Sequence, residues 1–191
     1  WSYHMVGRQK GWEGAWPERE GKQLSRIIHL SIDVLKVHPR NIEFFDDIDG
    51  ETYEMFKKSI KKDGILTPLT VAPDMTIISG HQRYKACKDL GIELVPSIIR
   101  EDLTDEKDKL KTLLAANFGR LRNNPVKQGK VFAEYEKLCG VQHGGDRKSN
   151  QKNCGLITQE EIAEQLGVST QTIRNLKKLQ TLSPELQQMI E

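Results

Sequence analysis

The spacing of apolar residues in the first half of the chain predicts a mixture of strands and helices. Alternating apolar positions predict strands over 26–35, 65–72, 75–78 and 93–99. Apolar residues at helical spacing predict helices over 52–63 and 81–90, each closed by a glycine, Gly64 and Gly91. The order strand, helix, two strands, helix, strand predicts a compact α+β domain, in the form of a small mixed sheet with helices.

The second predicted strand, over 65–72, contains Pro68. Proline has no backbone N–H to donate to a neighbouring strand, so we expect an edge strand or a bulged one. Pro73-Asp74 then predicts the turn of a hairpin that leads into the strand over 75–78.

The second half of the chain predicts helices only. An apolar stripe predicts a helix over 104–118, and Pro125 is favourable as the first residue of another helix that runs to about Leu138. The polar, glycine-containing and basic segment over 143–153 predicts a flexible loop between helices.

The last two predicted helices, over 158–179, have the spacing of a helix-turn-helix. Ala163 is small where a second helix crosses, Gly167 supplies the turn, Val168 fills the corner and Ile173 anchors the second helix. An ordinary helical hairpin with polar outer faces is the alternative. We favour DNA binding because the positions able to reach a major groove carry hydrogen-bonding side chains, namely Ser169, Thr170, Gln171, Thr172, Arg174, Asn175 and Lys178.

A possible phosphate site precedes these helices. Gly80, His81, Gln82 and Arg83 connect a predicted strand to a basic predicted helix. The first N–H groups of a helix have no internal partner and favour an anion, and an arginine binds phosphate oxygens as a planar fork. A plain corner with a solvated basic face explains the same residues, so both interpretations stay open on this motif alone.

Composition and charge place the chain among globular proteins. It has 191 residues, 29% charged, with a net charge of +2, which suits one sizeable core or two small domains. Eight Lys or Arg residues and three Asp or Glu residues lie between Arg120 and Lys152, a local charge of +5 on a nearly neutral chain. Such a stretch can contact phosphates beside the helix-turn-helix.

Other classes of protein receive little support. Three cysteines are too few for a disulfide framework, and Cys139, His143 and Cys154 match no common zinc finger, so no metal site is expected from them. No apolar run is long enough to cross a bilayer and no signal peptide is evident, so we expect a cytoplasmic protein. Residues 1–23 contain three tryptophans without periodicity and predict an irregular arm.

Three motifs in this order resemble the three boxes of the N-terminal domain of the ParB family. The first motif covers 56–71, the second combines 80–86 with Leu90-Gly91 and Val95-Pro96, and the third is Asn117-Phe118-Gly119-Arg120 followed by Asn124-Pro125. The helix-turn-helix follows where that family places one. The resemblance implies a ParB-like domain over 24–118 and a helical DNA-binding domain over 119–191.

The resemblance also implies a function. Such a protein is a chromosome- or plasmid-partition or regulatory factor that binds double-stranded DNA as a homodimer, at the nucleoid or a plasmid, and responds to CTP bound with Mg²⁺. Carried over by position, the residues around the nucleotide would be Thr67, Pro68, Gly80, His81, Gln82, Arg83, Asn117 and Arg120.

The chain departs from the family pattern at three places. His81 stands where the family has an acidic residue, and Ala116 stands where a glutamate helps to hold the metal. Lys127 and Gln128 replace acids after the third motif. Since Mg²⁺ prefers oxygen ligands, these changes favour nucleotide binding over hydrolysis, with at most a weak CTPase activity and no catalytic residue assigned.

Two other functions remain open. Free serine kinases share the pocket, and Glu51 or Glu54 would be the candidate base, although both also fit the polar face of a helix. Sulfiredoxin needs a cysteine where this chain has His81, so that activity is not expected. A DNA-binding adaptor with a decayed nucleotide site is the other alternative.

Overall fold

The computed structural model describes residues 26–140 and 157–189. Its sheet consists of β1 (Ile27–Ser31), β2 (Lys36–Val37), β3 (Leu69–Val71), β4 (Thr76–Ser79) and β5 (Leu94–Ile99). The strand order is β1-β5-β3-β4-β2. β1 pairs antiparallel with β5 and β3 antiparallel with β4, whereas β3 pairs parallel with β5 and β2 parallel with β4. The predicted α+β fold with a mixed sheet is therefore confirmed.

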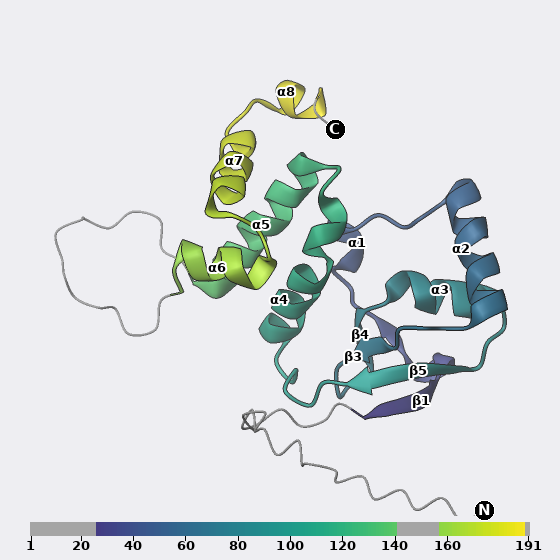
Figure 1. Cartoon of the computed structure of the whole chain (residues 1–191). Coiled ribbons are helices and arrows are strands. Elements are labelled where there is room, and N and C mark those ends of the chain that lie inside the picture. Colours follow the sequence, from purple (N-terminus) through teal and green to yellow (C-terminus); the bar gives the residue numbers. More distant parts are fainter. Residues whose placement is uncertain (1–25, 141–156, 190–191) are drawn as a thin grey trace, which may run out of the picture.

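The helices follow the predicted order (Figure 1). Those of the first half are η1 (Ile32–Val34), α1 (Asn41–Phe44), α2 (Gly50–Asp63) and α3 (His81–Asp89). Those of the second half are α4 (Glu106–Asn117), η2 (Phe118–Leu121), α5 (Pro125–Cys139), α6 (Gln159–Leu166), α7 (Thr170–Gln180) and α8 (Pro184–Gln188). In Figure 1, α2 and α3 lie together over the sheet, and α5, α6 and α7 gather at the other end of the molecule.

The strand after Pro68 differs from its prediction. β3 lies between β5 and β4 in the middle of the sheet, so the expectation of an edge strand is wrong. Pro68 precedes the strand, and its missing N–H therefore removes no bond from the ladder. The bulge is confirmed, because the register between β3 and β4 shifts between Thr70 and Val71.

The predicted first strand, over 26–35, is shorter than expected. β1 ends at Ser31, and the short helix η1 follows. Ser31 has extended backbone angles, and its hydroxyl accepts a hydrogen bond from the backbone N–H of Asp33 (3.4 Å), which starts the helical turn. Serine competes for backbone hydrogen bonds in this way, and the alternation of apolar residues does not reveal it.

Two apolar cores meet on β4. One lies between the sheet and α2 and α3, and includes Leu69, Ile77 and Val95. The other contains Ile78 and continues through α4 and α5 into α6 and α7. Ile77 and Ile78 belong to different cores because neighbouring side chains on a strand point to opposite faces. The predicted domain boundary at residue 118 stays a prediction, since the second core runs across it.

Some predictions concern residues that the structure does not describe. These are the arm over 1–23 and the loop over 143–153, including His143, together with Cys154. Across the two described ranges, no helix is long and apolar enough to cross a membrane.

Candidate functional site

The corner between β4 and α3 requires a glycine. Gly80 is the N-cap of α3 with φ 105° and ψ 20°, a left-handed conformation that other residues rarely adopt. A Cβ atom there would lie 2.9 Å from Cγ of Leu69, which is fully buried, and 3.3 Å from Nη2 of Arg83. Gly80 therefore lets the Arg83 guanidinium pack over the start of its own helix.

A pocket of about 270 Å³ opens at this corner. It combines the start of α3 with the end of α4, and its lining residues are Ile48, Phe56, Ser79, Gly80, Gln82, Arg83, Ala116, Asn117 and Arg120. The structure thus brings together five residues that the sequence assigned to one site from segments about 35 positions apart, namely Gly80, Gln82, Arg83, Asn117 and Arg120.

Arg83 carries positive charge into the pocket without a carboxylate partner. Its Nη1 donates to the backbone oxygen of Pro68 (2.9 Å) and also to that of Thr67. Burial, and then the positive charge of Arg120, lower the pKa of the Arg83 guanidinium. Within the part of the chain that the structure describes, neither arginine pairs with an acidic side chain. Two unneutralised cations therefore face one cavity, which favours an anionic ligand.

Asn117 positions Arg120 from the end of α4. Asn117 is 3% exposed, and its Nδ2 donates to the backbone oxygen of Leu113 (2.8 Å). Its Oδ1 accepts from Nη1 of Arg120 (3.3 Å). The amide is thus bonded at both ends, and it directs the arginine that follows one turn later.

Gln82 connects the pocket to the segment over 45–49, between α1 and α2. Its Nε2 donates to Oδ1 of Asp47 (2.7 Å), and its Oε1 accepts from the backbone N–H of Ile48 (3.3 Å). Nζ of Lys85 lies 2.6 Å from the other oxygen of Asp47. The neighbouring Asp46 pairs with Lys127 of α5. This segment therefore contacts both α3 and α5 through its carboxylates.

His81 lies behind the pocket and does not line it. It is 7% exposed, and neither its Nε2 nor that of the buried His38 has a hydrogen-bond partner. Burial, and then the charges of His38 and Arg120, lower the pKa of His81 to about 4. The imidazole is therefore neutral at pH 7, so it adds no positive charge beside the two arginines. Thr67 and Pro68, also predicted to lie around the ligand, contribute the carbonyl groups that hold Arg83.

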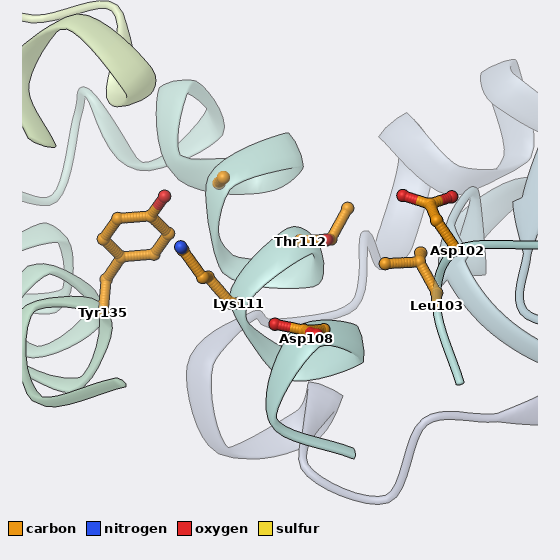
Figure 2. A pocket seen from close by; sticks show the side chains of 7 residues that line it. Asp102, Leu103, Asp108, Lys111, Thr112 and Tyr135 are labelled. Carbon is orange, nitrogen blue, oxygen red and sulfur yellow. The ribbon is translucent and has the colours of Figure 1, made fainter. Parts of the chain in front are cut away.

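A second pocket, of about 250 Å³, lies along another face of α4 (Figure 2). Figure 2 shows Lys111 and Thr112 on α4 between Tyr135 on one side and Asp102 and Leu103 on the other. The wall contains two carboxylates, from Asp102 and Asp108, and one cation. A phosphate group therefore fits this groove less well than it fits the arginine pocket.

The helix-turn-helix has the predicted caps. Thr158 and Glu161 form a capping box, with bonds of 3.2 Å and 2.7 Å to each other's backbone N–H. Gly167 ends α6 with φ 66°, and the Ser169 hydroxyl accepts from the backbone N–H of Thr172 (3.1 Å) at the start of α7. Ile173 is 1% exposed and belongs to the core that α6 and α7 share with α5. The predicted helix-turn-helix arrangement is confirmed.

Two residues of α5 fix this pair of helices, and neither stood out in the sequence. Gly129 lies under α7, where an added Cβ would come within 2.5 Å of Nε2 of Gln180. Glu136 is 3% exposed and lies 2.7 Å from Nζ of Lys177. It also accepts from Nε2 of Gln159 on α6 (3.3 Å). A glycine inside a helix and a buried carboxylate are both signals of close packing, but only the fold shows their partners.

The predicted DNA-contacting residues divide into two groups. Gln171, Arg174, Asn175 and Lys178 are exposed and lie at helical spacing on one face of α7. Ser169 and Thr172 instead bond each other's hydroxyl groups (2.9 Å) in the cap of the helix, and Thr170 is half-buried. Within the first group, Nε2 of Gln171 donates to Oδ1 of Asn175 (3.1 Å), and all four side chains remain accessible on the surface of α7.

The sequence did not single out the apolar wall of the arginine pocket. Ile48 follows α1 and lies in no motif, whereas Phe56 lies on α2 and begins the first sequence motif without having been assigned to the ligand. The two glutamates considered as a kinase base do not line the pocket. Glu51 is exposed, and Glu54 pairs with Lys57 (2.7 Å) on the same helix.

Comparisons with known proteins found a family model, curated relatives and solved structures that match this chain. The family model of the ParB N-terminal domain matches residues 18–118. The chromosome-partitioning protein Spo0J of Thermus thermophilus is 29% identical over 86% of this chain and 55% of its own length. A nucleoid occlusion protein of Lysinibacillus sphaericus is 30% identical over 86% of this chain and 50% of its own length. The chain thus spans about half the length of the curated relatives it matches.

A solved structure shows the same fold. It is the C-terminally truncated chromosome-partitioning protein ParB of Caulobacter crescentus complexed to the centromeric parS site. The TM-score is 0.62 with 22% sequence identity, over 84% of this chain and 75% of that chain.

Proposed function

The chain belongs to the ParB family, and on this basis we propose that it is a DNA-binding partition or regulatory protein whose DNA binding responds to a bound nucleotide. The single observation that supports the nucleotide is the pocket in which Arg83 and Arg120 face the same cavity without acidic partners. CTP is the nucleotide expected from the family. As in the sequence-based expectation, the partner is double-stranded DNA bound by a homodimer, in the cytoplasm at the nucleoid or a plasmid.

The phosphates of the nucleotide would lie between α3 and α4. Arg83 and Arg120 supply charge and donors from opposite sides, and the first backbone N–H groups of α3 lie beside Gly80. The base would pack against Ile48 and Phe56, which form the apolar part of the wall. Each part of the ligand would thus meet a group of matching chemistry.

The Mg²⁺ that the family resemblance implies does not fit the residues present. None of the residues that line the pocket is acidic, and Ala116 occupies the position of the expected ligand. Asp47, next to Ile48, is already bonded to Lys85 and Gln82. We therefore derive no step through a metal ion.

The proposed response to the nucleotide is a change in the position of the helices that carry α7. Asn117 and Arg120 end α4, and η2 leads within a few residues to Asn124, whose side chain accepts from the N–H of Lys127 and caps α5. A ligand that pulls Arg120 toward Arg83 would tilt α5 relative to α3. Because α5 packs against α7 and holds it through Gly129 and Glu136, α7 would move with α5.

The proposed DNA contact is the exposed face of α7. Gln171 and Asn175 offer paired donors and acceptors, and Arg174 and Lys178 offer charge-assisted donors. Of the three cations of α7, Lys177 pairs with Glu136, so the basic residues between Arg120 and Lys152 would supply much of the phosphate contact.

Isothermal titration with CTP, ATP and GTP, followed by DNA-binding measurements with each nucleotide, tests this proposal. We expect one nucleotide to bind and to change DNA affinity. Arg83→Ala should weaken nucleotide binding by about 100-fold, in line with a lost charge-assisted pair, while retaining DNA binding without nucleotide. Arg174→Ala should weaken DNA binding by about 10-fold and leave nucleotide binding intact.

Arg122→Ala is the matched control for the loss of one positive charge, since Arg122 is exposed and does not line the pocket. If folded protein binds no nucleotide and Arg83→Ala behaves like the wild type, the pocket has no such role. The chain would then be a DNA-binding adaptor with a decayed site.

A further inference from the structure

The charges around the arginine pocket are unusually one-sided. Of the residues that line it, Arg83 and Arg120 are cationic and none is anionic. Each arginine is bonded only to neutral oxygens within the described ranges, Arg83 to the two carbonyl groups of Thr67 and Pro68 and Arg120 to the amide of Asn117. The cavity therefore has two formal positive charges before any ligand enters.

Two of the three neutral side chains that bring oxygen to the wall, Gln82 and Asn117, already use that oxygen in a hydrogen bond, and the third is the hydroxyl of Ser79. The side-chain oxygen of Asn117 accepts from Arg120, and that of Gln82 accepts from the backbone N–H of Ile48. A divalent cation such as Mg²⁺ needs oxygen ligands and prefers carboxylates. It would also be repelled by two guanidinium groups in the same cavity. The chemistry of the wall therefore suits an anion and opposes a cation.

Two of the three carboxylates beside Ile48 are occupied, and the third, Asp49, is the exposed N-cap residue of α2 and does not line the pocket. Asp47 accepts from Lys85 (2.6 Å) and Gln82 (2.7 Å), and the lysine pair lowers the pKa of its carboxyl group. Asp46 pairs with Lys127. Moving either carboxylate into the pocket would break an ion pair and release the segment over 45–49 from α3 or α5. The residues that line the pocket therefore offer a metal ion no carboxylate.

We propose that this pocket binds its polyphosphate ligand without a divalent cation, with Arg83 and Arg120 neutralising the charge that Mg²⁺ neutralises elsewhere. This inference rests on the proposed nucleotide function and adds to it the form of the ligand, the free nucleotide. The guanidinium of Arg83 is held by carbonyl groups at one end, and its remaining donors can bind two phosphate oxygens as a fork.

Ala116 makes the inference testable by gain of function. Ala116 is exposed, lines the pocket and precedes Arg120 by four residues along α4 and η2. A carboxylate at this position would lie about one helical turn from Arg120 and could pair with it. Ala116→Glu should therefore both repel the phosphates and create an oxygen ligand for Mg²⁺.

The experiment is isothermal titration of CTP into the whole chain, once with excess EDTA and once with excess MgCl₂. For the wild type, we expect affinities that agree within about 3-fold, because none of the residues that line the pocket supplies a carboxylate to the metal. Ala116→Glu should bind at least about 10-fold more weakly in EDTA and should recover with MgCl₂. Ala116→Gln has nearly the same shape without charge, and it should stay independent of MgCl₂.

The outcomes separate this inference from the function on which it rests. Wild-type binding that appears only with MgCl₂ would overturn the inference and leave the nucleotide function standing. The same holds if Ala116→Glu shows no greater response to MgCl₂ than Ala116→Gln does. No binding in either buffer would overturn both.

Discussion

The helix-turn-helix and the arginine pocket are held together in different ways. The helix-turn-helix lies within one apolar core, where Ile162 and Ile173 are at most 1% exposed, and its caps are formed by its own residues. The pocket is formed by segments from α2, α3 and α4 that meet through arginines, amides and carbonyl groups. The helix-turn-helix therefore has satisfied caps and a packed core, whereas the pocket contains two arginines whose positive charge a ligand could neutralise.

This difference indicates which part of the molecule can rearrange when a ligand binds. An apolar core has few alternative packings, so the exposed face of α7 keeps its shape. The polar contacts around the pocket are individually weak and can rearrange when an anion arrives. A nucleotide would therefore shift α4 and α5 as bodies rather than deform the helix-turn-helix. Substitutions in each region test this difference.

The largest effect is expected from Ile173→Ala. Removing a fully buried side chain from the shared core of α5, α6 and α7 should lower the free energy of unfolding by about 2–5 kcal/mol, because a cavity remains. Denaturant unfolding followed by circular dichroism measures it. A loss well below 1 kcal/mol would contradict the view that this apolar core stabilises the helix-turn-helix.

Acid should lower the stability of the protein through protonation of His81, which lies behind the pocket. The folded pKa of His81, about 4, lies below its ordinary value of 6.5, so the unfolded chain binds more protons between these values. Stability is then fully present above pH 6.5 and falls as the pH drops toward 4, by the order of 3 kcal/mol.

Thermal unfolding of the wild type and of His81→Leu at several pH values measures this effect. His38, Arg120 and Asp47 also act on the imidazole, and His38, whose pKa burial also lowers, titrates alongside it. We therefore expect the variant to reduce the acid sensitivity without abolishing it. Equal pH profiles would show that His81 is not the group responsible.

Gly129 tests how closely α7 is seated on α5. Gly129→Leu should cost about 1–3 kcal/mol, because its side chain must displace Gln180 and push the helices apart. Gly129→Ala moves only the flexible amide of Gln180 and gains helix propensity, so it should change stability by less than about 1 kcal/mol. Thermal unfolding compares the two. Equal changes in stability for the two variants would contradict the close packing of α7 on α5.

The smallest effect on stability is expected from Asp46→Asn. The carboxylate is 72% exposed and pairs with Lys127 on the surface, so its loss should cost less than about 1 kcal/mol. If this pair helps to carry the response between α3 and α5, the variant should still change how strongly the nucleotide alters DNA affinity. Fluorescence anisotropy with labelled DNA, with and without nucleotide, would measure that change. If the nucleotide changes DNA affinity equally in the variant and the wild type, the Asp46–Lys127 pair does not carry the response, and the coupling must run through α4.

The sequence predicted the helix-turn-helix more completely than it predicted the pocket. The helix-turn-helix could be predicted almost completely, because its caps and its turn glycine, such as Thr158, Gly167 and Ser169, act on neighbours in the chain. For the pocket, the local pattern predicted Gly80 and Arg83, whereas Asn117 and Arg120 followed only from the family resemblance. Ile48 and Phe56 were not assigned to the pocket, although Phe56 begins the first motif, because they approach α3 and α4 only in the folded chain.

The central position of β3 was missed for a related reason. Pro68 argued against a central strand, but the strand begins one residue later, and a one-residue boundary is beyond what alternation of apolar residues can define. Similarly, Gly129 and Glu136 are ordinary helix residues in sequence, and their importance depends on residues of α7 about 40 to 50 positions away.

The two neighbouring isoleucines of β4 limit how this protein can be divided. Because Ile77 and Ile78 support different cores, a fragment that stops at residue 118 would expose the face of α4 that α5 covers. Exchanging the DNA-reading helices for those of a relative would have to preserve that covering surface. The part that contains the arginine pocket and the part that contains the helix-turn-helix should therefore be inherited, and engineered, as one cooperative unit.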